Sequence, residues 1–500
     1  MGIPNVDVLK RALEEGMGLT FDDVLLVPGM SDVVPRDVDV KTRLSRNIPL
    51  KIPFVSADMD TVTEAKMAIE LAKEGGIGFI WKFPDIERQE DEVSKVKYKL
   101  NKRIDKPICI REDKTVGDLE EILRKYENGF SSLVVLNAEQ RVVGLLTRDK
   151  YQFAKRTTHV RDVMVRNPLT SQEDLDVKQA YDFMKTRGVA KVILVDSDGK
   201  LRGLYCWKDV REIIENATPL YNRDGGGQLR VGANIGVNDF ERAERLLRRK
   251  CDVLLVGTAH GHSGNVIKTV KELRTQFTRY TFDIVAGNVA TYEAARVLFE
   301  AGADGVKVGV GPGSICTTRI TTGAGAAQLS AIYECALAGA EFDLPIIGDG
   351  GIRFSGDVTK ALAAGASSVM IGNLFAATDE ASGETIMLNG IKYKVYRGMG
   401  SLDAMSAHKS ARARYAQEGA EKLVPEGVKT RAPLKGPVRD VLYQLVGGLR
   451  SGMGYVGART IQELQTKRRF RRVTSEGVIE SHPHDVTIMG ETHNYGGGGG

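Results

Sequence analysis

The chain has few cysteines and no recognisable export signal, and these two shortages limit where it works. Only five of its 500 residues are cysteines, and no two of them form a C-x-x-C pair, so a zinc or dithiol redox motif is not expected. An odd number of widely spaced thiols is typical of a reducing compartment, which predicts a cytoplasmic location. The N-terminal residues lack the basic and then apolar pattern of a secretion signal.

The chain also has little excess charge and no unbroken apolar run. Its 70 Lys and Arg against 65 Asp and Glu leave a net charge of +5, which is too weak to indicate a nucleic-acid partner. We interpret the basic run at 467–472 as solvated surface. The most apolar stretch, 361–377, contains glycine, serine and asparagine and is too broken to cross a membrane.

Glycine, in contrast, is abundant, and it lies in short clusters. The 55 glycines make up 11% of the 500 residues, against about 7% in average proteins. They follow no fixed period, so they do not indicate a collagen-like chain. Clusters of this kind are typical of loops whose backbone approaches a phosphate closely.

Eight short apolar segments alternate with helical patterns and predict a (β/α)8 TIM barrel. The segments are rich in Val and Ile and do not alternate with polar residues, as expected for parallel strands that are buried on both faces. A doubly wound sheet is the structural alternative, but the count of eight favours the barrel. The expected strands are 52–56, 76–80, 230–235, 252–256, 282–286, 305–310, 345–348 and 367–371.

About 150 residues separate the second expected strand from the third, and they contain an internal repeat. Residues 131–150 and 190–209 each read as a strand, a polar turn, a second strand and a helix with an Asp at its start. Two copies indicate a paired module inserted into the barrel. It resembles a tandem pair of cystathionine-β-synthase-type domains, which bind adenine or guanine nucleotides, although a purely structural insert is the alternative.

These patterns divide the chain into four parts. The expected boundaries are 1–106 for the first part of the barrel, 107–215 for the inserted module, 216–495 for the second part of the barrel, and 496–500 for a flexible glycine tail.

The segment 309–328, GVGPGSICTTRITTGAGAAQ, carries the strongest chemical signal. It follows an expected strand at the end of the barrel where active sites of this fold lie. Gly311 and Gly313 permit a tight turn, and Ser314 adds a hydroxyl. Cys316 lies near Arg319, whose charge favours a thiolate nucleophile. The other four cysteines are interpreted as small buried hydrophobic residues: Cys109, Cys206, Cys251 and Cys335.

Two further glycine-rich segments end expected strands, at 346–353 and 369–374. Consecutive backbone N–H groups at these positions suit a phosphate. Asp349 would repel a phosphate, so we expect it to bind ribose hydroxyls. Together these segments predict a nucleoside monophosphate laid across the mouth of the barrel.

Six motifs, including the Cys316 loop, resemble the family of inosine-5′-monophosphate (IMP) dehydrogenases and GMP reductases. The other five are LTFDDVLLVPG at 19–29, SADMDTVTE at 56–64, GDGGIR at 348–353, YRGMGSLDAM at 396–405, and the stretch 423–436. The resemblance covers nearly the whole chain. It implies NAD-dependent oxidation of IMP to xanthosine monophosphate (XMP), the guanine branch of purine synthesis, through a covalent Cys316 intermediate that water hydrolyses.

The resemblance also implies a role for individual residues. Thr317, Arg414 and Tyr415 would position and activate the water. The substrate would contact Ser314, Asp349, Gly351, Gly372, Asn373, Tyr396, Met399, Gly400 and Glu426. NAD would contact Gly257, Asn288 and Arg319. A potassium ion would bind the carbonyls of Gly311, Gly313 and Cys316 together with Glu480, Ser481 and His482 of a neighbouring subunit, in a homotetramer or octamer.

The segment 406–432 is charged and poor in apolar periodicity, which predicts a long functional loop; the resemblance implies a mobile flap. The chain departs from the family pattern at Gly257, where an Asp is usual, at Trp81, where a His is usual, and at Asp58, where a small residue or Pro is usual. Two other functions stay open: a GMP reductase, which uses NADPH to deaminate GMP to IMP, and a nucleotide-sensing regulator with impaired catalysis. Arg414 and Tyr415 favour the dehydrogenase, because only a dehydrogenase must activate water.

Overall fold

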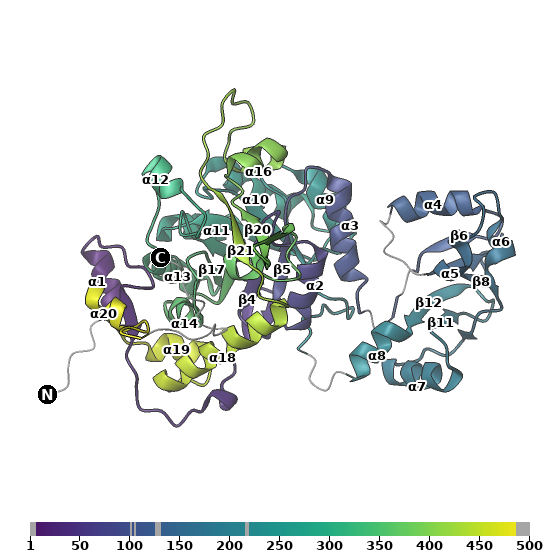
Figure 1. Cartoon of the computed structure of the whole chain (residues 1–500), viewed down its shortest axis with the longest axis horizontal. Helices are drawn as coiled ribbons and strands as arrows, with labels where there is room; N and C mark the ends of the chain where they lie inside the picture. The colour runs from purple at the N-terminus through teal and green to yellow at the C-terminus, as the bar shows by residue number, and fades with distance from the viewer. Residues whose placement is uncertain (1–6, 101–102, 105–106, 126–131, 216–219, 487–500) are drawn as a thin grey trace. The chain divides into compact units, whose positions relative to one another are not determined.

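The computed structural model describes residues 7–100, 103–104, 107–125, 132–215 and 220–486 (Figure 1). The chain forms two compact units. The first comprises residues up to 93, 220–222 and those from 230 onward, and the second comprises 94–219 and 223–229. The predicted domain boundaries stay a prediction, and the glycine tail at 496–500 lies outside the described residues.

The first unit contains a closed barrel of eight parallel strands, each of which overlaps a segment expected from the sequence. The prediction of a (β/α)8 barrel is therefore confirmed, and closure between β18 and β4 excludes the open doubly wound sheet. The strands are β4 (Phe54–Ser56), β5 (Ile77–Ile80), β13 (Gly232–Asn234), β14 (Val253–Gly257), β15 (Asp283–Val289), β16 (Gly305–Val308), β17 (Ile346–Asp349) and β18 (Ser368–Ile371).

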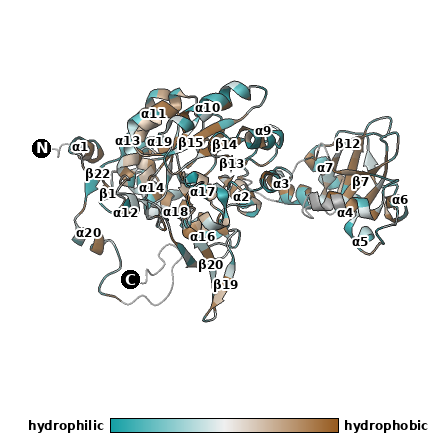
Figure 2. Cartoon of the chain, turned by 90° about the horizontal axis from the view of Figure 1, so that it is seen from above, coloured by the Kyte–Doolittle hydropathy of each residue, from teal (hydrophilic) through white to brown (hydrophobic). Residues whose placement is uncertain are grey.

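Amphipathic helices surround this barrel, and hydrophobic and hydrophilic residues alternate along them (Figure 2). Most of them pack on neighbouring strands through apolar side chains, as the sequence pattern predicts, whereas α18 packs mainly on α14. The helices are α2 (Ala65–Lys73), α3 (Ile86–Lys97), α9 (Phe240–Arg248), α10 (Gly264–Gln276), α11 (Tyr292–Glu300), α13 (Gln328–Phe342), α14 (Ser355–Ala363) and α18 (Val438–Val456).

A hairpin closes the N-terminal end of the barrel. Strands β2 (Thr42–Ser45) and β3 (Ile48–Leu50) contribute Leu44, Ile48 and Leu50 to the same apolar core as Phe79 of β5. Ser45 Oγ donates to the carboxylate of Asp283, the first residue of β15, at 2.6 Å. Because this end is plugged, the open end of the barrel is the one where the strands finish.

The predicted flap, 406–432, is not the featureless loop that its composition suggested. It includes α17 (Lys409–Arg414) and most of β21 (Lys429–Pro433), and it follows α16 (Leu402–Ala407). Strand β21 pairs with β20 (Ile391–Arg397), which in turn pairs with β19 (Thr385–Leu388). The sheet anchors the C-terminal end of the flap, whereas residues 406–407 at its start are the end of α16. Within the flap, 408 and 415–428 are without helix or strand.

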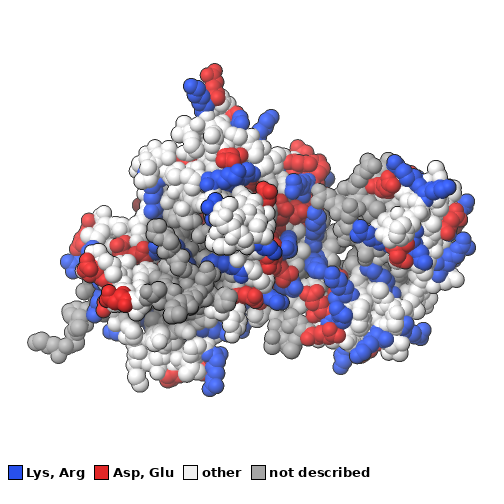
Figure 3. All heavy atoms as spheres, viewed as in Figure 1, with Lys and Arg blue, Asp and Glu red and all other residues white. Residues whose placement is uncertain are grey.

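The remaining elements of the first unit are short. Strand β1 (Val24–Leu26) pairs with β22 (Phe470–Arg472), which lies within the basic run. Arg471 and Arg472 are exposed, and positive and negative side chains are interspersed on the face shown in Figure 3. The short helices are α1 (Val8–Glu14), η1 (Pro35–Asp37), α12 (Thr318–Thr322), α15 (Asn373–Ala376), α19 (Ile461–Lys467) and α20 (Ser475–Glu480). Among the described residues, no helix is long and apolar enough to cross a membrane.

In the second unit, both copies of the repeat have the same order of elements. The first copy gives β7 (Ser132–Leu136), β8 (Val142–Thr147) and α5 (Arg148–Tyr151), and the second gives β11 (Lys191–Val195), β12 (Leu201–Cys206) and α8 (Trp207–Glu215). The other elements are β6 (Cys109–Arg111), α4 (Val116–Lys125), α6 (Val160–Val163), β9 (Val165–Arg166), β10 (Thr170–Ser171) and α7 (Val177–Arg187).

The two copies share one apolar core. Val134 and Leu145 of the first copy pack with Ile193 and Leu204 of the second. The turns also meet, because the N–H of Val142 donates to the carbonyl of Gly199 at 2.9 Å. The inserted module is therefore one structure made of two equivalent halves.

The barrel core predicts a large loss of stability for Phe79→Ala. Phe79 is fully buried, and removing a buried aromatic ring costs about 3–5 kcal/mol. The chain has two tryptophans, one in each unit: Trp81 and Trp207. In a Trp207→Phe background, urea unfolding followed by Trp81 fluorescence should show a lower urea midpoint for Phe79→Ala. Phe153→Ala, at a side chain that is 86% exposed, is the control, and an equal shift in both variants would contradict the assignment of the core.

Candidate active site

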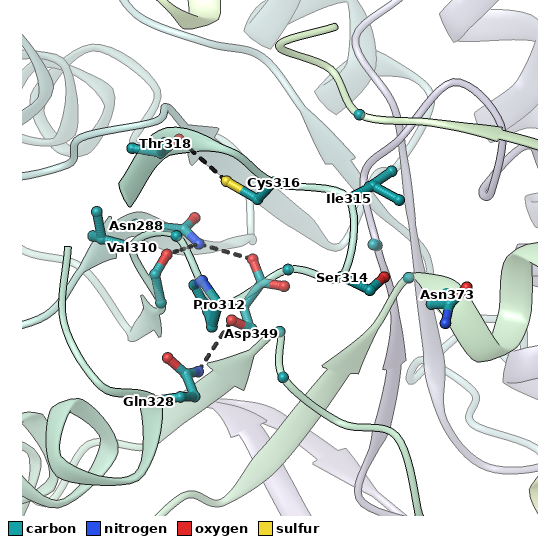
Figure 4. Close-up of a pocket in the computed structure, with 18 of the residues that line it drawn as sticks. Asn288, Val310, Pro312, Ser314, Ile315, Cys316, Thr318, Gln328, Asp349 and Asn373 are labelled. Carbon is teal, nitrogen blue, oxygen red and sulfur yellow. Dashed lines mark hydrogen bonds between the residues drawn. The ribbon is translucent and has the colours of Figure 1, made fainter. Parts of the chain in front are cut away.

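A cavity of about 400 Å³ opens where the barrel strands end, and it brings together most of the predicted site residues (Figure 4). Its walls come from the segments that follow β4, β14, β15, β16, β17 and β18, together with residues of the flap. Fifteen predicted residues line it: Asn288, Gly311, Gly313, Ser314, Cys316, Arg319, Asp349, Gly351, Gly372, Asn373, Tyr396, Met399, Arg414, Tyr415 and Glu426.

The loop between β16 and α12 presents Cys316 to this cavity. Gly311 has φ +82°, and a Cβ there would lie 2.5 Å from the Cγ of Arg319, so only glycine fits. The guanidinium of Arg319 donates to the carbonyl of Val310 at 3.3 Å and to that of Ala326. Arg319 thus ties the two arms of the loop together, and its predicted role toward NAD stays a prediction.

Cys316 heads a chain of hydrogen bonds that ends on the flap. Its Sγ donates to Thr318 Oγ1 at 3.1 Å, and Thr318 Oγ1 donates to Glu426 Oε2 at 2.8 Å. The sequence prediction named the neighbouring Thr317 and missed Thr318. The Thr-Thr pair after the cysteine was the available signal, but only the fold shows which hydroxyl faces the sulfur.

Backbone contacts fasten the flap to the cysteine loop. The N–H of Thr317 donates to the carbonyl of Glu426 at 3.0 Å, and the N–H of Val428 donates to the carbonyl of Ile315 at 3.0 Å. These bonds lie on both sides of Gly427, which forms a β-bridge with Cys316. The flap is therefore docked in this structure, with Glu426 beside the reactive sulfur.

Two tyrosines border the cavity as neutral groups, Tyr396, which is buried, and Tyr415, which is half-buried. A Cβ on Gly400 would lie 2.6 Å from the ring of Tyr415, so the missing side chain makes room for that ring. Burial raises the pKa of Tyr415 to about 12 and raises that of Tyr396 above its ordinary value. Both phenols stay protonated near neutral pH and can donate a hydrogen bond.

A buried charge network lies beneath the cavity. The Nζ of Lys307 is 2.6 Å from Asp349 Oδ2 and 3.4 Å from Asp58 Oδ1. Asn288 Nδ2 also donates to Asp349 at 2.8 Å. On the other side, Arg414 Nη1 donates to Asp58 Oδ2 at 2.5 Å.

This network fixes the charge of its members. Burial alone would raise the pKa of Asp58, but Arg414 and Lys307 hold it well below the ordinary value of an aspartate. Burial would lower the pKa of Arg414, yet Asp58 raises it above its ordinary value. Asp58 is therefore an anion and Arg414 a cation when the flap is docked.

Comparison with known proteins places this geometry in a family. The family model described as "IMP dehydrogenase / GMP reductase domain" matches residues 18–484. The chain is 50% identical over 496 residues to the inosine-5′-monophosphate dehydrogenase of Aquifex aeolicus, covering 98% of this chain and 99% of that one. It is 46% identical over 482 residues to the Bacillus subtilis enzyme of the same name, covering 96% and 98%. The chain belongs to the IMP dehydrogenase / GMP reductase family.

Solved structures of this family are also similar in fold. A GMP reductase variant from Trypanosoma brucei in complex with guanosine 5′-monophosphate has a TM-score of 0.83 and 40% identity, covering 94% of this chain and 98% of that one. The T. brucei GMP reductase in complex with guanosine 5′-triphosphate has a TM-score of 0.74 and 37% identity, covering 93% and 100%. Membership therefore extends over both units of the chain.

Some predicted site residues lie outside the cavity wall. Gly257 is buried at the end of β14, and its neighbours Thr258 and Ala259 line the cavity instead. Thr317 caps α12, and Gly400 contacts the ring of Tyr415. The predicted potassium ligands Glu480, Ser481 and His482 lie at the end of α20, where the His482 ring packs on Phe354 at 5.9 Å. Their roles stay predictions.

Trp81, which stands where the family usually has a His, is buried between the flap and the barrel. Its ring centroid is 4.1 Å from that of Phe83 and 5.0 Å from that of His408. His408 joins α16 to α17. An apolar contact thus supports the flap at this position.

Cysteine burial differs from the sequence prediction at two positions. Cys251 and Cys335 are buried as expected, but Cys109 and Cys206 are only half-buried. Both lie in the inserted unit, at strand positions next to its shared core. Burial raises the pKa of Cys109 to about 11 and raises that of Cys206.

The raised pKa values of Cys109 and Cys206 predict selective alkylation of the cysteines. Iodoacetamide at pH 8 should modify Cys316 before Cys109 and Cys206, because thiolate is the reacting form and Cys109 forms it only as the pH approaches 11. Labelling of Cys109 should rise with pH above about 10 as its thiolate fraction grows. Peptide mass spectrometry measures the order, and Cys109 reacting first at pH 8 would contradict the description.

Proposed function

We propose that this protein oxidises IMP to XMP with NAD in guanine nucleotide synthesis. The observation that carries the proposal is the placement of Cys316 in one cavity with an aspartate suited to ribose and two glycine turns suited to a phosphate. Relatives at 46–50% identity over almost their full length bear the name inosine-5′-monophosphate dehydrogenase, which supports the same activity here.

Different residues of the cavity would bind the phosphate, the ribose and the purine of the substrate. The N–H groups at Gly351 and Gly372, the hydroxyl of Ser314 and the neutral phenol of Tyr396 would donate to the phosphate. Asp349 would accept from the ribose hydroxyls, and Lys307 and Asn288 keep its carboxylate in place. Met399, Gly400 and Glu426 would border the purine.

The chemistry has two steps. Cys316 Sγ attacks C2 of the hypoxanthine ring, and the hydrogen at C2 leaves with its electron pair for the nicotinamide of NAD. Water then adds at C2 and the thiol departs, so IMP, NAD⁺ and water give XMP, NADH and a proton. Thr317, Tyr415 and the Arg414 cation would hold the water, and the cation stabilises developing hydroxide.

One observation favours a second function, the reduction of GMP. The ion pair between Asp58 and Arg414 keeps Arg414 protonated, so it is a poor base for water, and a reductase needs no such base. The structural neighbours at 37–40% identity are named GMP reductase. A regulator with impaired catalysis is the third alternative, and turnover of either substrate would exclude it.

The first test of this proposal is turnover. Purified protein with IMP and NAD should produce NADH, measured by absorbance, and Cys316→Ala should lower the rate at least 10³-fold because the nucleophile is lost. Cys109→Ala is the control and should keep the wild-type rate. NADPH consumption with GMP, in place of NADH formation, would decide for the reductase.

We also propose that the inserted unit binds an adenine or guanine nucleotide as an effector. It holds a cavity of about 610 Å³ lined by Thr147, Arg148 and Asp149 of the first copy and by 189–191 of the second. A hydrogen bond from Thr147 lowers the pKa of Asp149, so its carboxylate can accept from ribose hydroxyls. Arg148 supplies a cation for phosphate.

Nucleotide binding to the insert predicts a separation of regulation from catalysis. Replacing 107–215 with a short linker should leave IMP oxidation within about threefold, because the residues proposed for catalysis lie elsewhere, and should remove any response to ATP or GTP. In the full chain, Arg148→Ala should weaken nucleotide binding about tenfold by calorimetry, since a charge-assisted hydrogen bond contributes roughly 1.5–3 kcal/mol. If neither ATP nor GTP binds the full-length protein, the effector proposal is wrong.

The cytoplasmic location, the potassium ion and the oligomer are proposals as well. Carbonyl oxygens such as those of Gly311, Gly313 and Cys316 are ligands that suit K⁺. Glu480, Ser481 and His482 of a second copy would complete the site. This requires an oligomer, which we propose is a homotetramer or octamer.

The potassium proposal makes activity depend on both the ion and assembly. Replacing K⁺ by Li⁺ should lower turnover at least tenfold, and light scattering should show a tetramer or larger. A monomer that is fully active without K⁺ would contradict both.

A further inference from the structure

Asp58, to which the sequence prediction gave no role, lies where the flap meets the barrel. It follows β4 and is 2% exposed. Its Oδ2 accepts hydrogen bonds from Arg414 Nη1 and from Asn234 Nδ2, each at 2.5 Å. Arg414 is the last residue of α17 and 356 positions away in the chain. Asp58 thus joins the docked flap directly to the framework of the barrel.

The charges around Asp58 balance only when the flap is docked. Asp58 and Asp349 are two carboxylates, and Lys307, whose side chain is 0% exposed, contacts both. Arg414 is the second cation. Undocking the flap would leave Asp58, which is 2% exposed, to share the single cation of Lys307 with Asp349, which is 19% exposed. A buried carboxylate that loses one of its two cations is costly.

Space around Asp58 is kept by Gly257. A Cβ at this position would lie 2.6 Å from Asn234 Nδ2 and 3.3 Å from Asp58 Oδ2. Any larger side chain would therefore push Asn234 away from the carboxylate. The absence of a side chain at Gly257 therefore lets Asn234 and Arg414 both contact Asp58.

We propose that Asp58 is a positioning residue that orients Arg414 and holds the flap docked during the hydrolysis half of the reaction. This inference rests on the proposed function, because hydrolysis is a step of the dehydrogenase. Arg414 and Tyr415 line the cavity beside Cys316, so their orientation sets where the water is held. Hydride transfer uses Cys316 and the two nucleotides and does not need the ion pair between Asp58 and Arg414.

The kinetic test separates the two half-reactions in Asp58→Asn and Asp58→Ala. With saturating IMP and NAD, rapid mixing should show an NADH burst near one equivalent per site in both variants. Steady-state turnover should fall about 10–100-fold in Asp58→Ala, less than the roughly 10²–10⁴-fold that a catalytic group itself contributes, because Asp58 acts only through Arg414. It should fall less in Asp58→Asn, which still accepts a hydrogen bond. An equal loss of burst and steady state would overturn the proposal.

A double variant tests whether Asp58 acts through Arg414. In the Arg414→Ala background, adding Asp58→Ala should change the steady-state rate less than twofold, because the group that Asp58 positions is already gone. Losses that multiply would show an independent structural role and would overturn the proposal. Asp283→Asn, a buried carboxylate at the opposite end of the barrel that bonds to Ser45 and Asn47, is the matched control and should not separate burst from turnover.

Proteolysis without substrates tests docking apart from the reaction. Arg412 and Arg414 are both half-buried. The flap must therefore open locally before trypsin can cut after either residue. Asp58→Asn should be cut at least tenfold faster there than wild type and than Asp283→Asn. Equal rates would overturn the positioning role. If the wild type forms no NADH from IMP, the proposed function fails, and this measurement alone decides whether Asp58 holds the flap.

Discussion

The interaction on which the site depends is the burial of Lys307 between two carboxylates. Its ammonium, closed off from water, contacts Asp349 at 2.6 Å and Asp58 at 3.4 Å. A buried cation needs such partners, because removing one leaves an uncompensated charge that costs several kcal/mol. Lys307 lies on β16, just before the Cys316 loop, so the same contact that neutralises it also fixes that loop against the ends of β4 and β17. The substrate-facing carboxylate and the flap-facing carboxylate are two sides of one ion cluster.

Besides its backbone bonds to the cysteine loop, the flap makes two side-chain contacts that differ in kind, one that leads to Cys316 and one to Asp58. Thr318 and Glu426 reach the sulfur through hydrogen bonds, whereas Arg414 is held by charge. A hydrogen-bonded contact can re-form with substrate oxygens, whereas opening the ion pair leaves Asp58, which is 2% exposed, without one of its two cations, and that is costly. The flap thus combines a hydrogen bond from Thr318 to Glu426 near the thiol with an ion pair between Arg414 and Asp58. This division suits a reaction in which the same cavity first accepts a dinucleotide and then closes around water.

The sequence predicted the barrel well because each strand carries its own signal. Segments such as 252–256 and 282–286 are apolar on both faces, and that property does not depend on distant residues. The Cys316 loop was equally local, since its glycines, hydroxyls and cysteine are adjacent. Arg414 and Asp58 were each noted in the sequence, one for a role toward water and the other as a departure from the family pattern. Their pairing was not predicted because they are 356 residues apart. Lys307 was hidden for the same reason, inside an apolar strand. The helix α17 was missed because its six residues are too few and too polar to show an apolar face.

The central claim is that the nucleotide is oxidised while bonded to Cys316, and it can be measured directly. The Tyr415→Phe variant should accumulate the intermediate, because its water is poorly held. Mixed with IMP and NAD, quenched in acid within the first turnover and digested, it should yield a Cys316 peptide heavier by the mass of IMP less two hydrogens, the hydride given to NAD and the thiol proton, in step with the NADH formed. NADH formation with an unmodified Cys316 peptide at every quench time would contradict the account.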